Sequence, residues 1–334
     1  MEHRTLGKSS LKPSVLGLGG LHFGVFSDEK QANRIVRRAL DLGINFIDTA
    51  PLYGNGRSES FIRQAIGGRR QEVILATKVG LEPRTTGEGM FGVAVAPLDR
   101  AAIRASLERS LRELGTDCID LFQLHAFNPE YPPEETLSTL DQLVAEGKIR
   151  FTGCSNYDSG QLNLMMGVAE ENGWAGFTSL QAHYNLIERR CEKEIVPACR
   201  ARGIGVVCNR ALARGVLTGK YKWNRPYPEG SRAQSSVRVR RCLAESTLGL
   251  VEKLDRFAQE RGWTSTALAV AWLLAQPGVS VVLAGVRDVT QLEACIRATQ
   301  WHLSREDLGE IDRLIGQTGL LPQLTAAPET FLET

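Results

Sequence analysis

The sequence lacks a long hydrophobic run, paired cysteines and a leader segment. Its longest apolar stretch, Thr266–Ala275, is far shorter than the ~20 residues that span a bilayer. The seven cysteines are scattered and form no Cys-x-x-Cys pair, which argues against a disulfide framework or a zinc site. No apolar segment follows the charges of the amino terminus, so a secretory signal is not expected. We therefore expect a cytoplasmic protein with reduced thiols and no metal.

The chain also lacks an excess of charge of one sign. Its formal net charge is +2 over 334 residues, which gives no electrostatic basis for binding nucleic acid or an anionic membrane surface. Hydrophobic residues make up 43% of the sequence, enough for a large core. Because α/β barrels exceed ~250 residues as one unit, we expect one domain over residues 1–334. No linker-like segment interrupts it.

Eight short apolar runs rich in branched residues alternate with longer helical patterns. Parallel strands are covered on both faces, so they are apolar throughout and do not alternate. The runs are Val15–Leu18, Asn45–Asp48, Val73–Thr77, Ile119–Leu124, Arg150–Gly153, Ser179–Ala182, Gly205–Cys208 and Val279–Leu283. Eight strands with eight helical crossovers predict a (β/α)8 TIM barrel, with a doubly wound open sheet as the alternative.

Several segments fall outside the eightfold pattern. Arg4–Leu11 predicts an N-terminal β-hairpin that turns at Gly7, and the end of the chain predicts an extra C-terminal helix and tail. The gaps Gly80–Leu98 and Gly215–Ala244 are longer than a plain crossover. Both follow strands, so in a barrel they rise from the C-terminal rim, where active sites lie.

Four polar residues stand at or just after predicted strand ends: Asp48, Tyr53, Lys78 and His125. Taken singly, Asp48 could be a helix cap, Lys78 a solvated lysine and His125 a structural histidine. Together they suit carbonyl reduction, because hydride addition leaves an alkoxide that needs a proton donor. An ammonium ~4 Å from Tyr53 would favour the phenolate by about 4 kcal/mol and lower the pKa by roughly three units.

In this interpretation Asp48 holds the ammonium of Lys78 and offsets part of its effect on Tyr53. His125 orients and polarises the carbonyl oxygen. We expect all four groups to meet at one barrel mouth, since the strand ends converge there.

Six stretches make the sequence resemble the aldo-keto reductase superfamily over nearly its whole length. They are GINFIDTAPLYGNGRSE (43–59), ILATKVG (74–80), IDLFQLH (119–125), GCSNY (153–157), SLQAHYNL (179–186) and ARGVLTGKY (213–221). The resemblance implies a catalytic tetrad of Asp48, Tyr53, Lys78 and His125, with Tyr53 as general acid. All four positions carry the residue that the family leads us to expect.

The sequence has no Gly-x-Gly-x-x-Gly fingerprint, because His22 stands where the third glycine would be. The resemblance implies instead a nicotinamide dinucleotide across the barrel mouth, NADPH in preference to NADH. Its carboxamide would contact Ser155, Asn156 and Gln181, and its nicotinamide ring would stack on Tyr184. The alternative is that Ser155 and Asn156 cap a helix and that Tyr184 is a rim hydrophobe.

The rest of the dinucleotide would meet two further loops. The pyrophosphate would lie near Leu212, Arg214 and Gly215, beside Arg210, and the adenosine end near Gly285, Arg287 and Gln291, at a helix N-terminus suited to phosphate. Arg287 is the favoured partner of a 2′-phosphate. Lys220 would either assist in binding phosphate or be a solvated surface lysine. The chain departs from the family's Tyr-Ser-Pro-Leu-like stretch at Asn209–Leu212, and Ala294–Cys295 replace a Glu-Asn pair.

Aromatic and apolar residues predicted at the rim suggest a pocket for a hydrophobic or aromatic carbonyl substrate. They are His22, Phe23, Phe26, Met90, Phe91, Phe127 and Trp223, with Leu320, Leu321 and Phe331 from the tail. The alternative is that most of them anchor loops. The pattern does not indicate an oligomeric state.

Other functions remain open. The same hydride could reach an imine or an activated C=C bond, or the reaction could run as alcohol oxidation. Some aldo-keto reductase relatives are cofactor-binding regulatory subunits of potassium channels with little turnover, but the absence of an extended segment before Arg4 argues against that role. A plain sugar- or phosphate-binding barrel would leave the Asp-Tyr-Lys-His group without a purpose.

Overall fold

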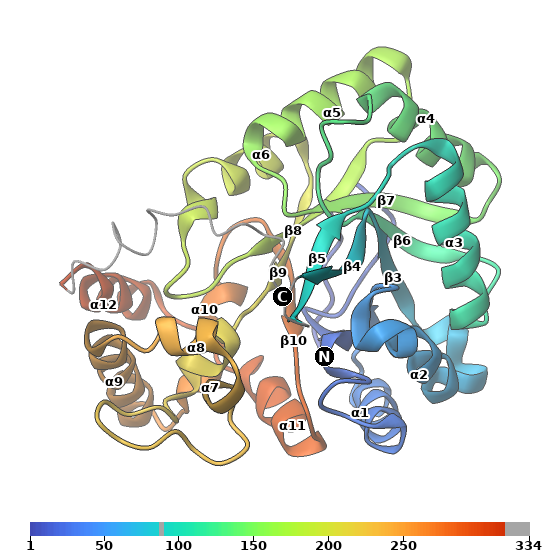
Figure 1. Cartoon of the computed structure of the whole chain (residues 1–334). Coiled ribbons are helices and arrows are strands. Elements are labelled where there is room, and N and C mark those ends of the chain that lie inside the picture. Colours follow the sequence, from blue (N-terminus) through green and yellow to red (C-terminus); the bar gives the residue numbers. More distant parts are fainter. Residues whose placement is uncertain (87–89, 318–334) are drawn as a thin grey trace.

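The computed structural model describes residues 1–86 and 90–317, and at its centre eight parallel strands close into a barrel (Figure 1). Around the barrel the order is β1, β2, β3, β6, β7, β8, β9 and β10, which pairs again with β1. The strands are β1 (Leu16–Gly19), β2 (Phe46–Asp48), β3 (Ile74–Val79), β6 (Ile119–Leu124), β7 (Ile149–Ser155), β8 (Phe177–His183), β9 (Gly205–Asn209) and β10 (Val279–Ala284). All eight predicted strands and the barrel are confirmed.

Helices cover the outside of the barrel (Figure 1). They are α1 (Glu29–Asp41), α2 (Arg57–Ile66), α3 (Arg100–Leu114), α4 (Pro133–Ala145), α5 (Ser159–Asn172), α6 (Ile195–Arg202), α9 (Glu245–Glu260), α10 (Ser265–Leu274), α11 (Val289–Ala298) and α12 (Arg305–Gly316). Helix α12 is the expected extra C-terminal helix, and it packs against α9.

Helix α3 shows how local sequence sets these elements. The Asp99 side chain accepts a hydrogen bond from the Ala102 backbone at its start, and Gly115 ends it at φ 63°. Ile103, Leu107 and Leu111 lie on the buried face, as a period of 3.6 residues requires.

The N-terminal hairpin closes the bottom of the barrel. Its ladder consists of hydrogen bonds from the Arg4 nitrogen to the Pro13 oxygen and from the Leu6 nitrogen to the Leu11 oxygen, both 3.0 Å. Gly7 turns at φ +56°, and a Cβ there would lie 2.3 Å from the Thr178 oxygen, so only glycine fits. Leu6 and Leu11 join a buried cluster with residues of the barrel strands. With this end closed by apolar side chains, chemistry is confined to the opposite mouth.

Two long connections follow strands at that mouth, as the sequence gaps predict. After β3 the chain forms an antiparallel pair, β4 (Leu81–Thr86) and β5 (Met90–Val95). After β9 it forms the 3₁₀ turn η6 (Ala213–Thr218) and two short helices, α7 (Arg232–Ser235) and α8 (Val237–Arg241). Figure 1 shows β4 and β5 above the strand ends and α7 with α8 between the barrel and α9.

Candidate active site

The barrel brings together the four residues singled out by their positions at strand ends. Asp48 is the last residue of β2, Lys78 is near the end of β3, and His125 directly follows β6. Tyr53 begins the short turn η2 (Tyr53–Gly56) after β2. Since β2, β3 and β6 are neighbours in the barrel, their ends converge at one mouth.

A buried ion pair lies at the centre of this group. The Lys78 Nζ is 2.6 Å from Asp48 Oδ1 and 2.9 Å from the Thr49 oxygen, and the Lys78 side chain is fully buried. Burial by itself would lower the pKa of Lys78, but the charge of Asp48, aided by the hydrogen bonds of the ammonium to Asp48 and Tyr53, offsets this effect, so the pKa lies above its ordinary value. The ammonium is therefore charged at neutral pH.

Tyr53 lies over this ammonium. Its ring centre is 5.0 Å from Lys78 Nζ and 5.9 Å from the His125 ring, which meets it edge-on. The turn that carries Tyr53 has positive φ at Gly54, Asn55 and Gly56, and a Cβ at Gly54 would lie 2.1 Å from the Phe23 oxygen. Glycine thus allows the loops after β1 and β2 to pack closely enough to hold the phenol in place.

The expected lowering of the Tyr53 pKa is wrong. Burial raises the pKa of Tyr53 above its ordinary value, and the charge of Lys78 recovers only part of that rise. Asp48 adds to the rise, as its negative charge disfavours a phenolate. The expectation from the sequence took account of the charge of Lys78 but not of the loss of solvation, which is the larger effect here. The phenol is therefore protonated throughout the neutral range.

His125 is neutral. Burial and the nearby charge of Lys78 hold the pKa of its imidazole well below the ordinary value. The Asn156 amide donates to the His125 backbone oxygen at 2.8 Å, which ties the ends of β6 and β7 together. A neutral imidazole can donate one hydrogen bond to a carbonyl oxygen without adding charge.

Two amides complete the surroundings of Asp48, and the sequence analysis missed one of them. Gln123 Nε2 and Gln181 Nε2 donate to Asp48 Oδ2 at 3.0 and 2.9 Å, and Asn209 Nδ2 donates to Gln181 Oε1 at 3.1 Å. Gln123 sits within β6 and is buried inside the barrel. A polar residue in an otherwise apolar strand was the signal that could have identified it.

Buried polar atoms without partners indicate where a ligand fits. Ser155 Oγ, Asn156 Oδ1 and Asn209 Oδ1 are buried and have no hydrogen-bond partner among the described residues. They lie at the ends of strands β7 and β9, which flank β8 in the barrel, with Asn156 at φ 60°. An unmade hydrogen bond at a buried oxygen costs about 1–3 kcal/mol. A carboxamide offers the donors and the acceptor that such atoms require, so a nicotinamide fits this end of the mouth.

Tyr184 does not fit its expected stacking role. Its ring is 1% exposed, lies edge-on to Trp272 of α10 at 5.4 Å, and its hydroxyl is 2.7 Å from Glu192 Oε1. No face of the ring is open to the mouth. Gln181 is also engaged on both sides of its amide, by Asp48 and Asn209. Of the residues expected to contact the carboxamide, Ser155 and Asn156 are those with a buried oxygen that has no partner among the described residues.

The segment after β9 has an unusual backbone. Arg210, Ala213, Arg214 and Gly215 all have positive φ, although three of them carry side chains. Such conformations cost about 1–3 kcal/mol each and occur where a loop serves a ligand. Arg214 Nη1 lies 3.9 Å from Glu188 Oε1. Leu212 is partly buried and packs against the core.

A group of three basic residues, here called the cationic cluster, lies farther out: Lys220, Arg232 and Arg287. Burial and the neighbouring arginines lower the pKa of Lys220 and of Arg232, which shows that like charges are held close together. Within the described part of the chain, none of the three forms an ion pair with a carboxylate. The Ser231 Oγ beside them is buried without a partner. Such an arrangement suits the phosphates of a dinucleotide.

Arg232 was missed by the sequence analysis. It lies in a connection without a periodic pattern, where an arginine resembles any solvated charge. The adenosine-end residues named from the sequence are nearby: Arg287 Nη1 donates to the Gly230 oxygen at 2.9 Å, and the Arg287 backbone nitrogen donates to Gln291 Oε1 at 3.1 Å. Gly285 faces the His22 ring, 3.4 Å from where a Cβ would be.

The expected phosphate site at the N-terminus of α11 is already occupied by the protein. Asp288 caps this helix, with its carboxylate 2.8 Å from the Gln291 nitrogen. A carboxylate at a helix N-terminus satisfies the free backbone donors and repels a second anion. The side chain of Arg287, rather than the helix end, is the adenosine-side anion partner that the geometry offers.

The described residues among those expected to line a substrate pocket lie in differing surroundings. Phe23 is wholly buried in the core, and His22 packs against the Val286 oxygen, where burial and Arg232 lower its pKa to about 4. Phe127 meets Tyr157 edge-on at 5.6 Å, and Trp223 is 46% exposed on the long connection after β9. Met90 and Phe91 lie in β5. Their side chains, and Leu320, Leu321 and Phe331, lie outside the described residues.

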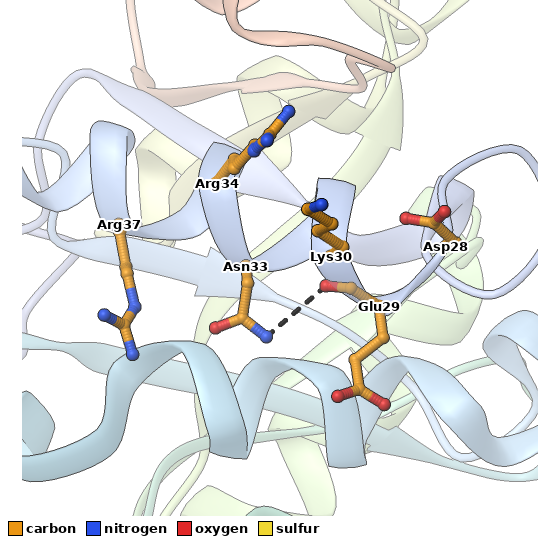
Figure 2. Close-up of a pocket in the computed structure, with 6 residues that line it drawn as sticks. All are labelled: Asp28, Glu29, Lys30, Asn33, Arg34 and Arg37. Carbon is orange, nitrogen blue, oxygen red and sulfur yellow. Dashed lines mark hydrogen bonds between the residues drawn. The ribbon is translucent and has the colours of Figure 1, made fainter.

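A hollow of about 640 Å³ lies elsewhere, over the outer face of α1 (Figure 2). It is lined by Asp28, Glu29, Lys30, Asn33, Arg34 and Arg37. Figure 2 shows these side chains spread along the helix, joined only by the hydrogen bond from Asn33 to the Glu29 oxygen. It is open to solvent and lacks an enclosed wall, so it is a surface groove and not a reaction site.

The described residues contain no group of three or more His, Cys, Asp or Glu side chains arranged to hold a metal ion. Over the same ranges, no helix combines the length and the apolar character that crossing a membrane requires. None of the seven cysteines, all of which lie in the described ranges, forms a disulfide bond.

Comparison with known proteins agrees with the geometry. The model of the "Aldo/keto reductase family" matches residues 15–315. The chain is 35% identical to "Aldo-keto reductase YhdN" of Bacillus subtilis, over 95% of both chains, and 32% identical to "Aldo-keto reductase yakc [NADP(+)]" of Schizosaccharomyces pombe, over 92% of this chain and 89% of that protein. The solved structure of the glycerol dehydrogenase AKR11B4 from Gluconobacter oxydans is similar at a TM-score of 0.84 and 29% identity, over 99% of this chain and 98% of the other.

Proposed function

The chain belongs to the aldo/keto reductase family and is an NAD(P)H-dependent oxidoreductase, and from that premise we propose that it reduces a small aldehyde or ketone with NADPH, using Tyr53 as the proton donor. One observation carries this proposal. A phenol, an ammonium, a carboxylate and a neutral imidazole occupy a single mouth, with Tyr53 5.0 Å from Lys78 Nζ and 5.9 Å from His125. No other part of the described chain gathers groups suited to this chemistry.

The raised pKa of Tyr53 suits a general acid. A phenol that is protonated at neutral pH can give its proton to the oxygen of a carbonyl as negative charge develops there. The ammonium of Lys78 stabilises the phenolate left behind, and Asp48 keeps that ammonium charged and in place. His125 is neutral and donates a hydrogen bond that orients the carbonyl oxygen.

The bound cofactor supplies the hydride. Ser155 and Asn156 would hold its carboxamide, since both have buried oxygens without partners. Arg210 and Arg214 in the strained loop and Arg232 of the cationic cluster would face the pyrophosphate. Arg287 would take the 2′-phosphate, which supports NADPH over NADH because a guanidinium matches phosphate oxygens in pairs. The name of the Schizosaccharomyces pombe relative includes NADP(+), which supports this preference.

The proposal is tested by titrating the protein with NADPH and with NADH by fluorescence, and then assaying a panel of aldehydes and ketones. A parallel panel of imines and activated alkenes, with alcohol oxidation in the reverse direction, separates the alternative reactions. We expect tighter binding of NADPH and turnover on carbonyls. Binding without turnover on any panel would favour a regulatory subunit.

Tyr53→Phe tests the acid. Turnover should fall by about 10²–10⁴-fold, because the variant keeps the ring but has no proton to give. The dissociation constant of NADPH should stay within about twofold, since Tyr53 is not among the cofactor-binding residues. A near-normal rate in this variant would reject Tyr53 as the proton donor.

A further inference from the structure

Phe26 lies at the cationic cluster in a way that substrate binding does not explain. Its ring is 45% exposed and stands in the loop between β1 and α1. The guanidinium carbon of Arg287 lies 4.1 Å from the ring centre, and that of Arg232 lies 5.8 Å from it. The His22 ring meets Phe26 edge-on at 5.4 Å, which fixes its orientation from another side.

Ser27 of the same loop and Gln31 of α1 both contact the Arg287 backbone. Gln31 Nε2 donates a hydrogen bond to the Arg287 backbone oxygen at 3.2 Å, and Ser27 Oγ donates to the same oxygen at 3.4 Å. On the other side, Arg287 Nη1 donates to the Gly230 oxygen at 2.9 Å. The loop after β1 and the connection after β9 therefore both contact Arg287, whose guanidinium carbon lies over the Phe26 ring.

We propose that Phe26 is a positioning residue that fixes the guanidinium of Arg287 for a phosphate monoester on the adenosine ribose, and that it thereby sets the preference for NADPH over NADH. The inference rests on the proposed function. Phe26 itself need not touch the cofactor. It acts through Arg287.

The physical reason is preorganisation. A free arginine side chain has about 2 kcal/mol of rotamer entropy to lose when it binds a ligand. The contact with the aromatic ring restricts the guanidinium before the ligand arrives, and the N–H groups that do not bond Gly230 can then donate to anion oxygens. Cation–π attraction contributes at exposed and partly desolvated sites alike. A ligand gains affinity from this preorganisation only if it contacts Arg287. In the proposed complex that contact is made by the 2′-phosphate of NADPH.

The test compares dissociation constants of NADPH and NADH for the full-length protein by fluorescence titration. Phe26→Ala should weaken NADPH by about 3- to 30-fold, the range that a lost cation–π contact of this kind corresponds to. NADH should change by about twofold or less, since it has no 2′-phosphate. Phe26→Tyr keeps the ring face and should bind both cofactors as the wild type does. Val25→Ala is the matched control, because Val25 is 60% exposed on the same loop.

A double-mutant cycle makes the assignment specific. In an Arg287→Ala background, Phe26→Ala should have no further effect on NADPH, because the residue it positions is gone. An equal loss for both cofactors, or a loss that persists without Arg287, would overturn the inference. So would NADPH binding by Phe26→Ala at the wild-type level. If the wild-type protein binds neither cofactor, the proposed function fails and the inference fails with it, whereas wild-type preference without a Phe26 effect rejects the inference alone.

Discussion

The proposed catalytic tetrad and the cationic cluster differ in their electrostatics. The charges of the tetrad are paired within the group, whereas those of the cationic cluster are all positive. In the tetrad, the Lys78 ammonium is paired with Asp48 at 2.6 Å, and two amides satisfy the second carboxylate oxygen. In the cationic cluster, burial and neighbouring arginines lower the pKa of Lys220 and of Arg232. Lys220, Arg232 and Arg287 have no carboxylate partner among the described residues.

The two regions differ in the ligand that their charges suit. The four groups of the tetrad lie at or just after strand ends, their charges are paired within the group, and we propose that they act on a neutral carbonyl. The cationic cluster sits on long connections and carries like charges that an anion would neutralise. We infer a division of labour in which the barrel determines chemistry and the loops determine which dinucleotide binds and how tightly.

Asp48→Asn should have the largest effect among the variants that sharpen this comparison. Without the carboxylate, burial is the main influence on Lys78, and the pKa of its ammonium should fall below the ordinary value. Turnover should drop by about 10²-fold or more. The alkaline limb of the kcat profile should move to lower pH, because Lys78 now loses its proton sooner. Asp41→Asn, at the exposed end of α1, is the control.

A steady-state pH profile checks this prediction. An alkaline limb that stays in place while kcat falls would show that Asp48 acts without influencing the ammonium. NADPH affinity should change little in this variant, as the division of labour requires.

Arg287→Ala should have the next largest effect, and it acts on the other region. Loss of hydrogen bonds to a charged group should weaken NADPH by about 10- to 100-fold. NADH should be affected far less, while Arg232→Ala should weaken both cofactors alike. At saturating cofactor, kcat should stay near the wild-type value in both variants. Arg37→Ala, in the groove of Figure 2, is the control and should bind both cofactors normally.

Cofactor titrations and kcat measurements on the same variants test whether the cationic cluster affects cofactor affinity without affecting turnover. A large fall of kcat at saturation in Arg287→Ala would break the division between chemistry and affinity. An equal effect of this variant on NADPH and NADH would remove its role at the 2′-phosphate.

Glu59→Gln should have the smallest effect, on stability alone. Glu59 is 1% exposed behind β3, accepts a hydrogen bond from Thr77 Oγ1 at 2.8 Å, and burial raises the pKa of its carboxyl. The folded state therefore favours the protonated acid. Its contribution to stability is present below the ordinary pKa of Glu and is lost as pH rises through the folded pKa.

The free energy of unfolding of the wild type should thus fall with pH over this window, and Glu59→Gln should flatten that fall. Each pKa unit corresponds to about 1.4 kcal/mol. Denaturant unfolding at acidic and at neutral pH measures the difference, with Glu171→Gln on an exposed turn of α5 as the control. Equal slopes for wild type and Glu59→Gln would show that Glu59 is ionised in the fold.

The barrel and the meeting of the tetrad could be predicted from the sequence because both depend on strand pattern. Apolar runs such as Ile119–Leu124 define the strands, and the closure of a parallel barrel then gathers Asp48, Lys78 and His125. Catalytic roles remain proposals, but the proximity of these groups follows from the fold.

The orientation and solvation of loop residues could not be predicted in the same way. Tyr184 is enclosed by Trp272, which is far away in sequence, and Phe23 turns into the core because Gly54 packs against its backbone. The sign of the Tyr53 pKa shift depends on burial, which no spacing of residues reveals. Arg232 and Phe26 become informative only when the loops that carry them are folded against Arg287.

A crystal structure of the protein with NADP+ tests the central claim most directly. The account predicts the carboxamide against Ser155 and Asn156, the nicotinamide ring beside Tyr53, and the 2′-phosphate on the guanidinium of Arg287 stacked on Phe26. A dinucleotide whose nicotinamide lies away from Tyr53, or whose phosphates avoid the cationic cluster, would contradict it.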